Sequence, residues 1–311
     1  MTAVDERAAW LAWRAGGIGA SDIGIILGLS SYGSPWSLWA EKSGLIERED
    51  TSDNQRLRIG HRMEAVLAAE FHDMTGLYVA GEQTWCTHHE HKWARCTVDG
   101  FVIEGPDGTE PIGVVEFKTD AHFGWEEIPP AYVAQVRWQM FVTGLTRAWL
   151  VVMFAGFRVE VFEIAHDPAD EAFMLERAAE FWQWVGTGTP PPLDGHDATA
   201  DAIAAMWPAQ VPDTVLVADD TLTHLLDSRA ALKARISEDQ KVVDQLDNEI
   251  AAAIGDNETV EVDGRPAWSY RAQSRTSLDT KALKSAHPEL DLEPFTKQST
   301  YRVLRPIKEK K

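Results

Sequence analysis

Cysteine is scarce in this sequence, and long apolar runs are missing from it. The 311 residues include two cysteines, Cys86 and Cys96, which are too few for a zinc ribbon or a four-cysteine iron–sulfur cluster. No apolar run reaches the roughly 18 residues that a membrane-spanning helix needs. Residues 1–6 lack the basic and apolar regions of a signal peptide. These absences predict a reduced, cytoplasmic protein with no membrane partner, and its 44% hydrophobic content is enough for a full core.

Positive charge is also in short supply. The chain has 49 Asp and Glu against 29 Lys and Arg, a net charge of −20, which disfavours a simple nucleic-acid-binding protein because phosphate contacts need Lys and Arg. Residues 260–311 hold 11 basic and 7 acidic residues, a net of +4, whereas the remainder holds 18 and 42, a net of −24. An acidic chain can still act on DNA through a local basic channel and metal ions, with salt-sensitive binding.

The stretch from residue 98 to residue 118 predicts a β-hairpin with a charged face. Apolar and β-branched residues flank a turn signal, Gly105-Pro106-Asp107-Gly108. With Asp107 and Gly108 as the central residues of a tight turn, Asp99 lies opposite Glu116, with their Cβ atoms about 5 Å apart. Lys118 is two residues beyond Glu116 and therefore projects from the same face.

Two facing carboxylates repel each other, so this pair suggests a bound cation. Each would raise the pKa of the other unless a cation intervenes, and Mg²⁺ is typically held by one or two carboxylates and by phosphate oxygens. Lys118 beside that ion could orient or deprotonate a water, or stabilise charge on a phosphate. The ordinary alternative is a surface hairpin with a cross-strand Glu/Lys face.

Three further segments carry polar residues of interest. A glycine-rich turn leads into a helix at residues 23–27, where Ser21 or Asp22 could cap the helix, and Arg14 close by could help to receive a phosphate. An ordinary capped helix explains this turn equally well. Glu64 lies in the middle of a helix predicted at 57–71, where solvent exposure is usual, and Gln135 shares one face of a predicted helix with Tyr132, Trp138 and Gln139.

Periodicity and turn signals place the other elements along the chain. Helices are predicted at 5–14, from 35 to about 44, at 129–143 and at 168–185, and strands at 77–86, 148–154 and 158–164. A heptad frame over 221–254 has apolar residues at eight of its ten core positions, with Arg229 and Asp239 at the other two, which predicts a coiled-coil-like helix. A second hairpin is predicted at 260–270. The predicted organisation is an N-terminal domain at 1–192, a linker at 193–220 and a C-terminal module at 221–311 that contacts DNA or a partner.

Five motifs occur in the order found in a known family. They are Gly17-Ile18-Gly19-Ala20-Ser21-Asp22, Gly60-x-x-x-Glu64, Val98-Asp99-Gly100, Glu116-Phe117-Lys118 and Tyr132-x-x-Gln135-x-x-x-Gln139-Met140-x-x-Thr143-Gly144. Together they resemble the YqaJ-type viral recombinases, the lambda-exonuclease-like branch of the PD-(D/E)XK nucleases, over about residues 8–165. One departure is Val98, where the family usually has proline.

The resemblance implies a fold and a role for each motif residue. The fold would be an α/β, restriction-endonuclease-like mixed sheet flanked by helices, with a helical and β-hairpin appendage. Asp99, Glu116 and the carbonyl of Phe117 would be metal ligands, with Glu64 approaching the metal from its helix. Lys118 would be the catalytic lysine, and Gln135 would lie beside the metal site. Arg14 and Ser21 would hold a 5′-terminal phosphate.

The resemblance also implies a reaction and partners. The expected activity is a Mg²⁺-dependent 5′-to-3′ exonuclease, with Mn²⁺ as a substitute metal, that acts on double-stranded DNA ends and leaves 3′ single strands for phage-type recombination. A single-strand annealing protein (RecT/Bet-like) and a homo-oligomeric, ring-shaped trimer are expected in the cytoplasm of a bacterial host cell. The alternatives are a structure-specific or restriction-type endonuclease of the same fold, and a non-catalytic module that binds DNA ends or a partner.

Overall fold

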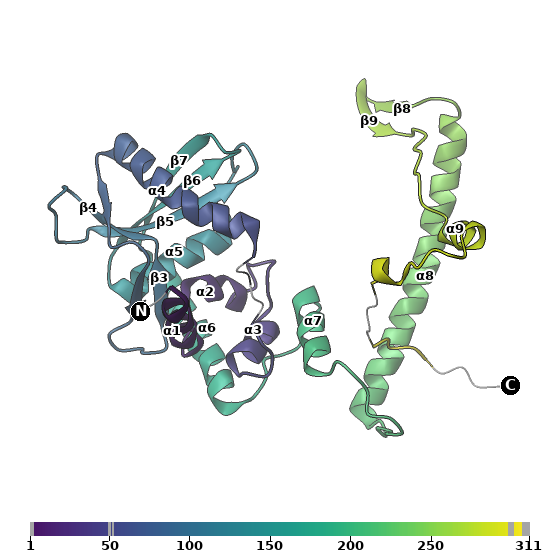
Figure 1. Ribbon diagram of the computed structural model, residues 1–311, viewed down its shortest axis with the longest axis horizontal. Helices are drawn as coiled ribbons and strands as arrows, with labels where there is room; N and C mark the ends of the chain where they lie inside the picture. The colour runs from purple at the N-terminus through teal and green to yellow at the C-terminus, as the bar shows by residue number, and fades with distance from the viewer. Residues whose placement is uncertain (1–2, 49–50, 52, 298–301, 307–311) are drawn as a thin grey trace. The chain divides into compact units, whose positions relative to one another are not determined.

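The computed structural model describes residues 3–48, 51, 53–297 and 302–306, and the chain divides into two compact units (Figure 1). The first unit comprises Met1–Ala209 with Tyr301–Lys311, and the second comprises Gln210–Thr300. In the described part of the chain, no helix is long and apolar enough to cross a membrane.

A mixed five-stranded sheet forms the centre of the first unit. Its order is β1 (Tyr78–Ala80), β4 (Gly100–Ile103), β5 (Gly113–Asp120), β6 (Arg147–Phe154) and β7 (Arg158–Ala165). β5 and β6 pair in parallel, and the other neighbours pair antiparallel. β5 therefore lies in the middle of the sheet with a partner on each side, as the α/β fold predicted from the sequence requires.

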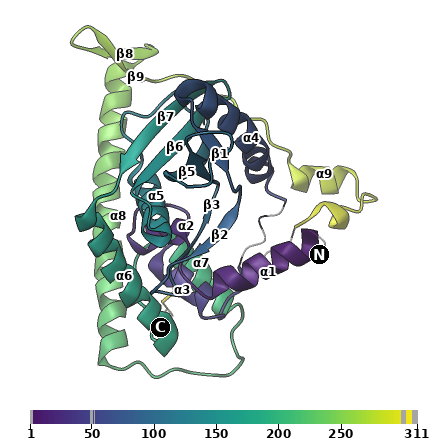
Figure 2. The same ribbon diagram turned by 90° about the vertical axis from the view of Figure 1, so that its left-hand side faces the viewer.

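Helices cover both faces of this sheet (Figure 1 and Figure 2). On β6, Trp149, Val151 and Met153 pack into one core with residues of α4 (Gln55–Thr75), whereas Leu150 and Val152 pack into a second core with residues of α5 (Pro130–Thr143). This alternation is the period of two expected for a strand that is buried on both faces. The second core also includes residues of α2 (Ala20–Ile26), α3 (Pro35–Lys42) and α6 (Pro168–Thr187).

The register predicted for the hairpin is confirmed, but the predicted turn is wrong. Gly100 pairs with Val115 and Phe101 with Val114, which is the register that sets Asp99 against Glu116. The chain turns through Pro106 and Asp107, closed by a hydrogen bond of 2.9 Å from Gly108 N to Gly105 O. A longer loop thus replaces the tight Asp-Gly turn, because Pro106 occupies the position after Gly105 that a type I turn favours for proline.

The strand predicted at 77–86 is divided in two. β1 joins the central sheet, and after a turn β2 (Thr84–Thr87) pairs antiparallel with β3 (Arg95–Val98) in a separate two-stranded sheet. Gln83 in the intervening turn has a positive φ of 53°. α1 (Ala3–Ala15) contacts this small sheet through the side chain of Trp10, whose Nε1 donates to Thr97 Oγ1 at 3.1 Å.

The first compact unit extends beyond the boundary expected at residue 192. α7 (Asp197–Met206) lies in the stretch that the sequence assigned to the linker, and it packs on α3. A buried hydrogen bond of 2.6 Å joins the hydroxyl groups of Ser34 and Thr199. Because α7 packs on α3, the first unit continues to Ala209, where the boundary with the second unit lies.

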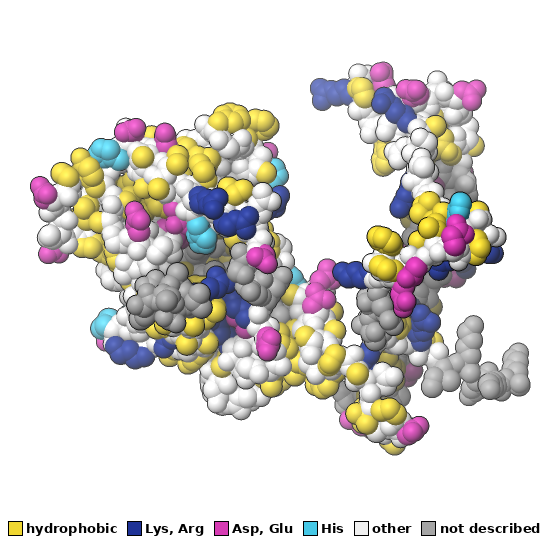
Figure 3. All heavy atoms as spheres, in the orientation of Figure 1, with side chains coloured by type: hydrophobic (Ala, Val, Ile, Leu, Met, Phe, Trp, Pro, Cys, Tyr) yellow, Lys and Arg dark blue, Asp and Glu magenta, His cyan; other side chains and the backbone are white. Residues whose placement is uncertain are grey.

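The second unit consists mainly of one long helix, α8 (Asp220–Ile254). It is followed by the predicted hairpin, formed by β8 (Thr259–Val262) and β9 (Arg265–Ser269), by α9 (Thr280–Ala286) and by a short 3₁₀ helix at Glu293–Phe295. In Figure 3, hydrophobic side chains lie beside charged ones on the visible face of this unit.

Candidate active site

Glu116 is the centre of the hydrogen-bond network on β5. Its side chain is 5% exposed, and three neighbours donate to its two oxygens. Gln135 Nε2 donates to Oε1 at 2.6 Å, Gln139 Nε2 donates to Oε2 at 2.6 Å, and the ammonium group of Lys118 donates to Oε1. Because both glutamines lie on α5, four residues apart, one helix face fixes the orientation of this carboxylate.

Lys118 forms an ion pair with Glu116 and lies over the ring of Tyr132, with Nζ 5.2 Å from the ring centroid. Burial lowers the pKa of Lys118, but the negative charges of Glu116 and Asp99 and the hydrogen bond to Glu116 outweigh burial, so the net pKa is raised. The lysine is therefore a cation at neutral pH, suited to donate hydrogen bonds and to stabilise negative charge.

Asp99 lies between β3 and β4 and faces β5. Its Oδ2 accepts a hydrogen bond of 2.8 Å from the backbone N–H of Phe117. Burial raises the pKa of Asp99 well above its usual value, and the negative charges of Glu116 and Glu64 raise it further. Asp99 and Glu116 are thus electrostatically coupled across the hairpin, as the register predicted.

Gln83 connects two of the acidic residues and was missed in the sequence. Its Nε2 donates to Glu64 Oε2 at 3.0 Å and to Asp99 Oδ1 at 3.1 Å. Glu64, on α4, also contacts His61 Nδ1 at 2.8 Å. A glutamine in a turn between two short strands gives no sequence signal, because its role depends on the turn that follows β1.

The chemistry of the donor set fits a hard divalent cation. Asp99, Glu116 and Glu64 offer carboxylate oxygens. Burial raises the pKa of Asp99 and the nearby charges of Glu116 and Glu64 raise it further, so a bound cation would stabilise the ionised carboxylate. Among the residues that the structure describes, no three His, Cys, Asp or Glu side chains form a ready-made metal cage.

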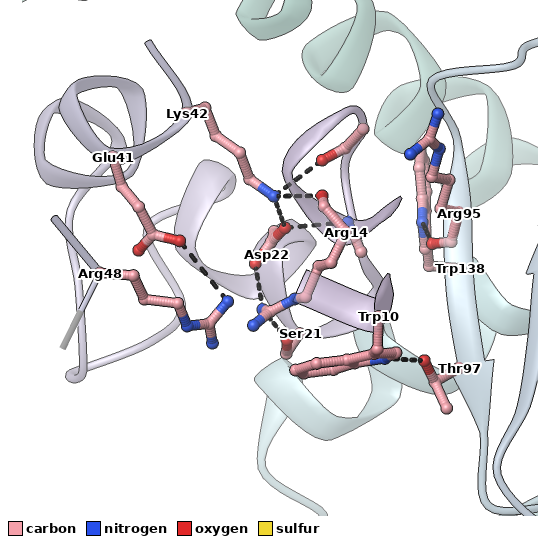
Figure 4. Close-up of polar contacts among 12 residues, drawn as sticks. Trp10, Arg14, Ser21, Asp22, Glu41, Lys42, Arg48, Arg95, Thr97 and Trp138 are labelled. Carbon is pink, nitrogen blue, oxygen red and sulfur yellow. Dashed lines mark hydrogen bonds and ion pairs between the residues drawn. The ribbon is translucent and has the colours of Figure 1, made fainter. Parts of the chain in front are cut away.

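A second polar cluster lies where α1 meets α2 (Figure 4). Arg14 Nη2 donates to Ser21 Oγ at 2.9 Å and to Asp22 Oδ1 at 2.7 Å. Lys42 Nζ lies 2.8 Å from Asp22 Oδ2, and both side chains are at most 2% exposed. Burial raises the pKa of Asp22, but the charges of Lys42 and Arg14 outweigh it, so the net pKa is lowered. Asp22 is therefore a buried, ionised anchor for both cations.

The cap predicted for this helix needs a correction. α2 begins at Ala20 with Gly19 as its N-cap, so neither Ser21 nor Asp22 occupies the capping position. Asp22 instead accepts the backbone N–H of Gly19 at 2.9 Å from the third position of the helix, as the acidic partner of a capping box does. The predicted proximity of Arg14 and Ser21 is present.

Hydrogen bonds connect the helix that carries Arg14 to the carboxylate centre. Arg14 lies 5.5 Å from the ring centroid of Trp10 on α1, and Trp10 donates to the hydroxyl group of Thr97. Gln139 Nε2 is 3.4 Å from Thr97 O and 2.6 Å from Glu116 Oε2. α2 also packs directly on α5. The two clusters thus share a framework of α1, β3 and α5.

The structure gathers the acidic and amide residues that the sequence suggested. Asp99, Glu116, Lys118, Glu64 and Gln135 all belong to the polar network around β5. Besides Gln83, the sequence reasoning missed the positioning contacts of Gln139 and Lys42. The helical spacing of Gln139 from Gln135 was a usable signal for the first, whereas nothing in the sequence pairs Lys42 with Asp22.

The carboxylate, lysine and amide network lies on the central strand of a mixed α/β sheet, and the match to a family of viral recombinases supports a nuclease enzyme. Residues 9–146 match the family model of the YqaJ-like viral recombinase domain. The chain is 28% identical over 306 residues to the uncharacterized protein YqaJ of Bacillus subtilis (strain 168), across 96% of this chain and 93% of that protein. The similarity to YqaJ therefore includes both units.

Two solved structures are similar to part of the chain. An alkaline exonuclease from Laribacter hongkongensis matches with a TM-score of 0.48 and 20% identity, covering 58% of this chain and 94% of that one. A phage-related exonuclease from Haemophilus somnus 129PT matches with a TM-score of 0.43 and 12% identity, covering 55% and 94%.

Proposed function

We propose that this protein is a Mg²⁺-dependent exonuclease that degrades one strand of double-stranded DNA from its 5′ end. The product would be a 3′ single strand for phage-type recombination by single-strand annealing. The observation that carries the proposal is the fixed Glu116 carboxylate, with Lys118 and Asp99 beside it, inside a YqaJ-like recombinase domain.

Asp99 and Glu116 are the proposed metal ligands, with Glu64 and the carbonyl of Phe117 as further oxygen donors. Mn²⁺ is expected to substitute for Mg²⁺, because both accept carboxylate, carbonyl and water ligands. A cation bound there would polarise the scissile phosphate and stabilise the leaving oxygen.

Lys118 and the two glutamines have separate proposed roles. Lys118 is the proposed catalytic lysine, which would orient or deprotonate the attacking water or neutralise charge on the phosphate. Gln135 and Gln139 would act through Glu116 by holding its carboxylate in one orientation. These two are positioning residues.

Arg14 and Ser21 are the proposed site for the 5′-terminal phosphate. The guanidinium of Arg14 already lies against the hydroxyl group of Ser21, and Asp22 and Lys42 hold this arrangement from the buried side. A guanidinium and a hydroxyl group in contact offer charge-assisted hydrogen bonds to phosphate oxygens. Recognition of a terminal phosphate would confine cleavage to DNA ends.

The proposed partners follow from the same family resemblance. They are double-stranded DNA ends and a single-strand annealing protein, in the cytoplasm of a bacterial host. The nuclease units are expected to form a homo-oligomer, with a ring-shaped trimer as the expected form.

The test compares two DNA substrates with the full-length protein. A linear duplex is labelled in separate samples at the 5′ end or the 3′ end of one strand. With Mg²⁺ present, nucleotides should be released only from the 5′ end, and EDTA should stop the reaction. A covalently closed duplex circle should stay intact. Linearisation of the closed circle would indicate an endonuclease and contradict the proposal, and so would binding of DNA ends without any metal-dependent cleavage.

A further inference from the structure

The long helix of the second unit presents an apolar seam whose large side chains are mostly exposed in the part of the chain that the structure describes. The seam is the set of heptad core positions of α8, with Leu222, Leu225, Leu232, Ile236, Val243, Leu246 and Ile250 as its large apolar members. Leu225 is 60% exposed, Ile236 is 61% exposed and Leu246 is 50% exposed. Apolar side chains repeated every 3.5 residues along one helix are the pattern of a coiled-coil interface.

Two charged residues of opposite sign interrupt the seam. Arg229 occupies a position equivalent to Leu222 and Ile236, and Asp239 occupies a position equivalent to Leu225 and Leu232. In the single chain Asp239 approaches Arg235 of its own helix at 3.9 Å, with both side chains more than 70% exposed. Such an exposed pair contributes little to stability, so neither seam charge is explained by contacts within α8.

The positions of these charges distinguish between the ways in which two copies of α8 could pair. Parallel helices in register would place Arg229 against Arg229 and Asp239 against Asp239 at the interface, and like charges at a buried contact are costly. A parallel trimer has the same defect. An antiparallel pair can instead place Arg229 of one copy against Asp239 of the other, twice by symmetry.

The antiparallel register that matches these charges also matches all the apolar residues in the overlap. It places Leu222 opposite Leu246, Leu225 opposite Val243 and Leu232 opposite Ile236, again twice by symmetry. A shift of one heptad in either direction sets Arg229 against a leucine and Asp239 against an apolar residue, which leaves both charges unpaired. One register therefore satisfies both the charged and the apolar positions.

We propose that two copies of this chain associate through an antiparallel, two-fold pairing of α8, with reciprocal Arg229–Asp239 ion pairs that fix the register. A two-fold interface must be self-complementary, and this seam is complementary to the same seam on a helix that runs in the opposite direction. The overlap from residue 222 to residue 246 spans about 36 Å of helix. The pairing uses the second unit, so it is independent of the proposed reaction and of any contact between nuclease units.

In this arrangement Lys233 lies beside the two-fold axis and faces Lys233 of the other copy. Arg235 lies on the other side of the axis and faces Arg235 of the other copy. Both side chains are long enough to turn their charges into water while their stems cover the seam. The ion pairs of the seam therefore determine the register, and these flanking charges limit the affinity.

The test measures the mass of the full-length protein in solution by sedimentation equilibrium. The unmodified chain should form particles with an even number of copies, because α8 would also join nuclease trimers in pairs. Arg229→Glu or Asp239→Arg should each halve that mass, with a loss of affinity on the order of 100-fold, because each places like charges in two layers of the interface. The double variant Arg229→Glu/Asp239→Arg should restore the original mass, and so should an equimolar mixture of the two single variants.

Matched controls reverse charges on the opposite side of the helix. Asp227→Arg and Lys241→Glu lie at the heptad position farthest from the seam and should leave the mass unchanged, and circular dichroism should show native helix content in every variant. The proposal is overturned if the unmodified chain is monomeric, which would indicate that the seam packs on its own chain or awaits another protein. It is also overturned if the charge reversals leave the mass unchanged, or if the double variant does not recover it.

Discussion

Gln139 Nε2 donates a hydrogen bond of 2.6 Å to Glu116 Oε2, in the buried space between α5 and β5. Gln139 is fully buried and Glu116 is 4% exposed. The amide therefore fixes the inner oxygen of the carboxylate, while Gln135 and Lys118 contact the outer one. The position of the Glu116 carboxylate therefore depends on α5 as well as on β5.

Replacement of Gln139 should reduce activity without removing any proposed ligand. Gln139→Met should lower kcat and the affinity for Mg²⁺ by about 10- to 100-fold, because Glu116 loses the donor that orients it. Gln183→Met, the same change at an exposed position of α6, should have no effect. Titration of kcat against Mg²⁺ tests this role, and an unchanged metal dependence in folded Gln139→Met would contradict it.

Arg14 should give the enzyme a preference for phosphorylated ends. We expect 5′-phosphorylated duplex to be degraded faster than 5′-hydroxyl duplex. Arg14→Ala should lower the ratio of these two rates about 10-fold, because the phosphate loses a charge-assisted hydrogen bond. Arg48→Ala, which removes an exposed arginine paired with Glu41 at 3.5 Å, should leave the preference intact. Equal initial rates on the two substrates with unmodified enzyme would remove the assignment.

His88 should make stability depend on pH. Its Nδ1 accepts the backbone N–H groups of Glu90 and His91 at 3.2 and 3.0 Å, and its ring stacks on Phe141. Burial lowers the pKa of His88 below 6.5, and the charges of His89 and His91 lower it further, with Glu90 and Glu171 opposing them. The stability that neutral His88 provides is therefore complete above pH 6.5 and is lost as the pH falls through the lowered pKa.

The measurement for His88 is the melting temperature as a function of pH. The unmodified protein should lose stability on acidification below pH 6.5, and His88→Gln should flatten this dependence. His89→Gln, at a side chain that is 79% exposed, should keep most of it. A melting profile that has the same slope in folded His88→Gln would show that another group is responsible.

The second unit should be dispensable for the chemical step. A chain ended after Ala209 also loses residues 301–311, but it retains α7 and its buried Ser34–Thr199 contact, so it should fold and cleave short duplexes at the full-length rate in a single turnover. It should lose salt-resistant binding, because each phosphate contact of a basic segment steepens the salt dependence. If this chain folds but cannot cleave at high enzyme concentration, the second unit completes the active site.

Local patterns in the sequence were sufficient for the hairpin register and for most helices. The pairing that brings Asp99 to Glu116 follows from the alternation of residues on two adjacent strands, and it survived an error in the turn because the loop kept the same register. Gly76 and Gly144 end α4 and α5 in left-handed conformations, as glycine after a helix predicts.

Contacts between distant segments were not predictable in the same way. Gln83 reaches Asp99 because the chain turns sharply after β1, and Lys42 reaches Asp22 because α3 packs beside α2. Neither contact has a fixed spacing in the sequence. The partition of 77–86 into strands of two different sheets was likewise invisible, because one short apolar segment gives the same pattern in either sheet.

The most direct test of the proposed active site is the rate of nucleotide release from a 5′-phosphorylated linear duplex, measured over a titration of Mg²⁺. Glu116→Gln keeps the size of the side chain but removes the charge, and Glu110→Gln makes the same change at an exposed position before β5. The account predicts a loss of about 1,000-fold or more for folded Glu116→Gln at saturating Mg²⁺, with Glu110→Gln unaffected. Near-normal Mg²⁺-dependent release by Glu116→Gln would contradict the account.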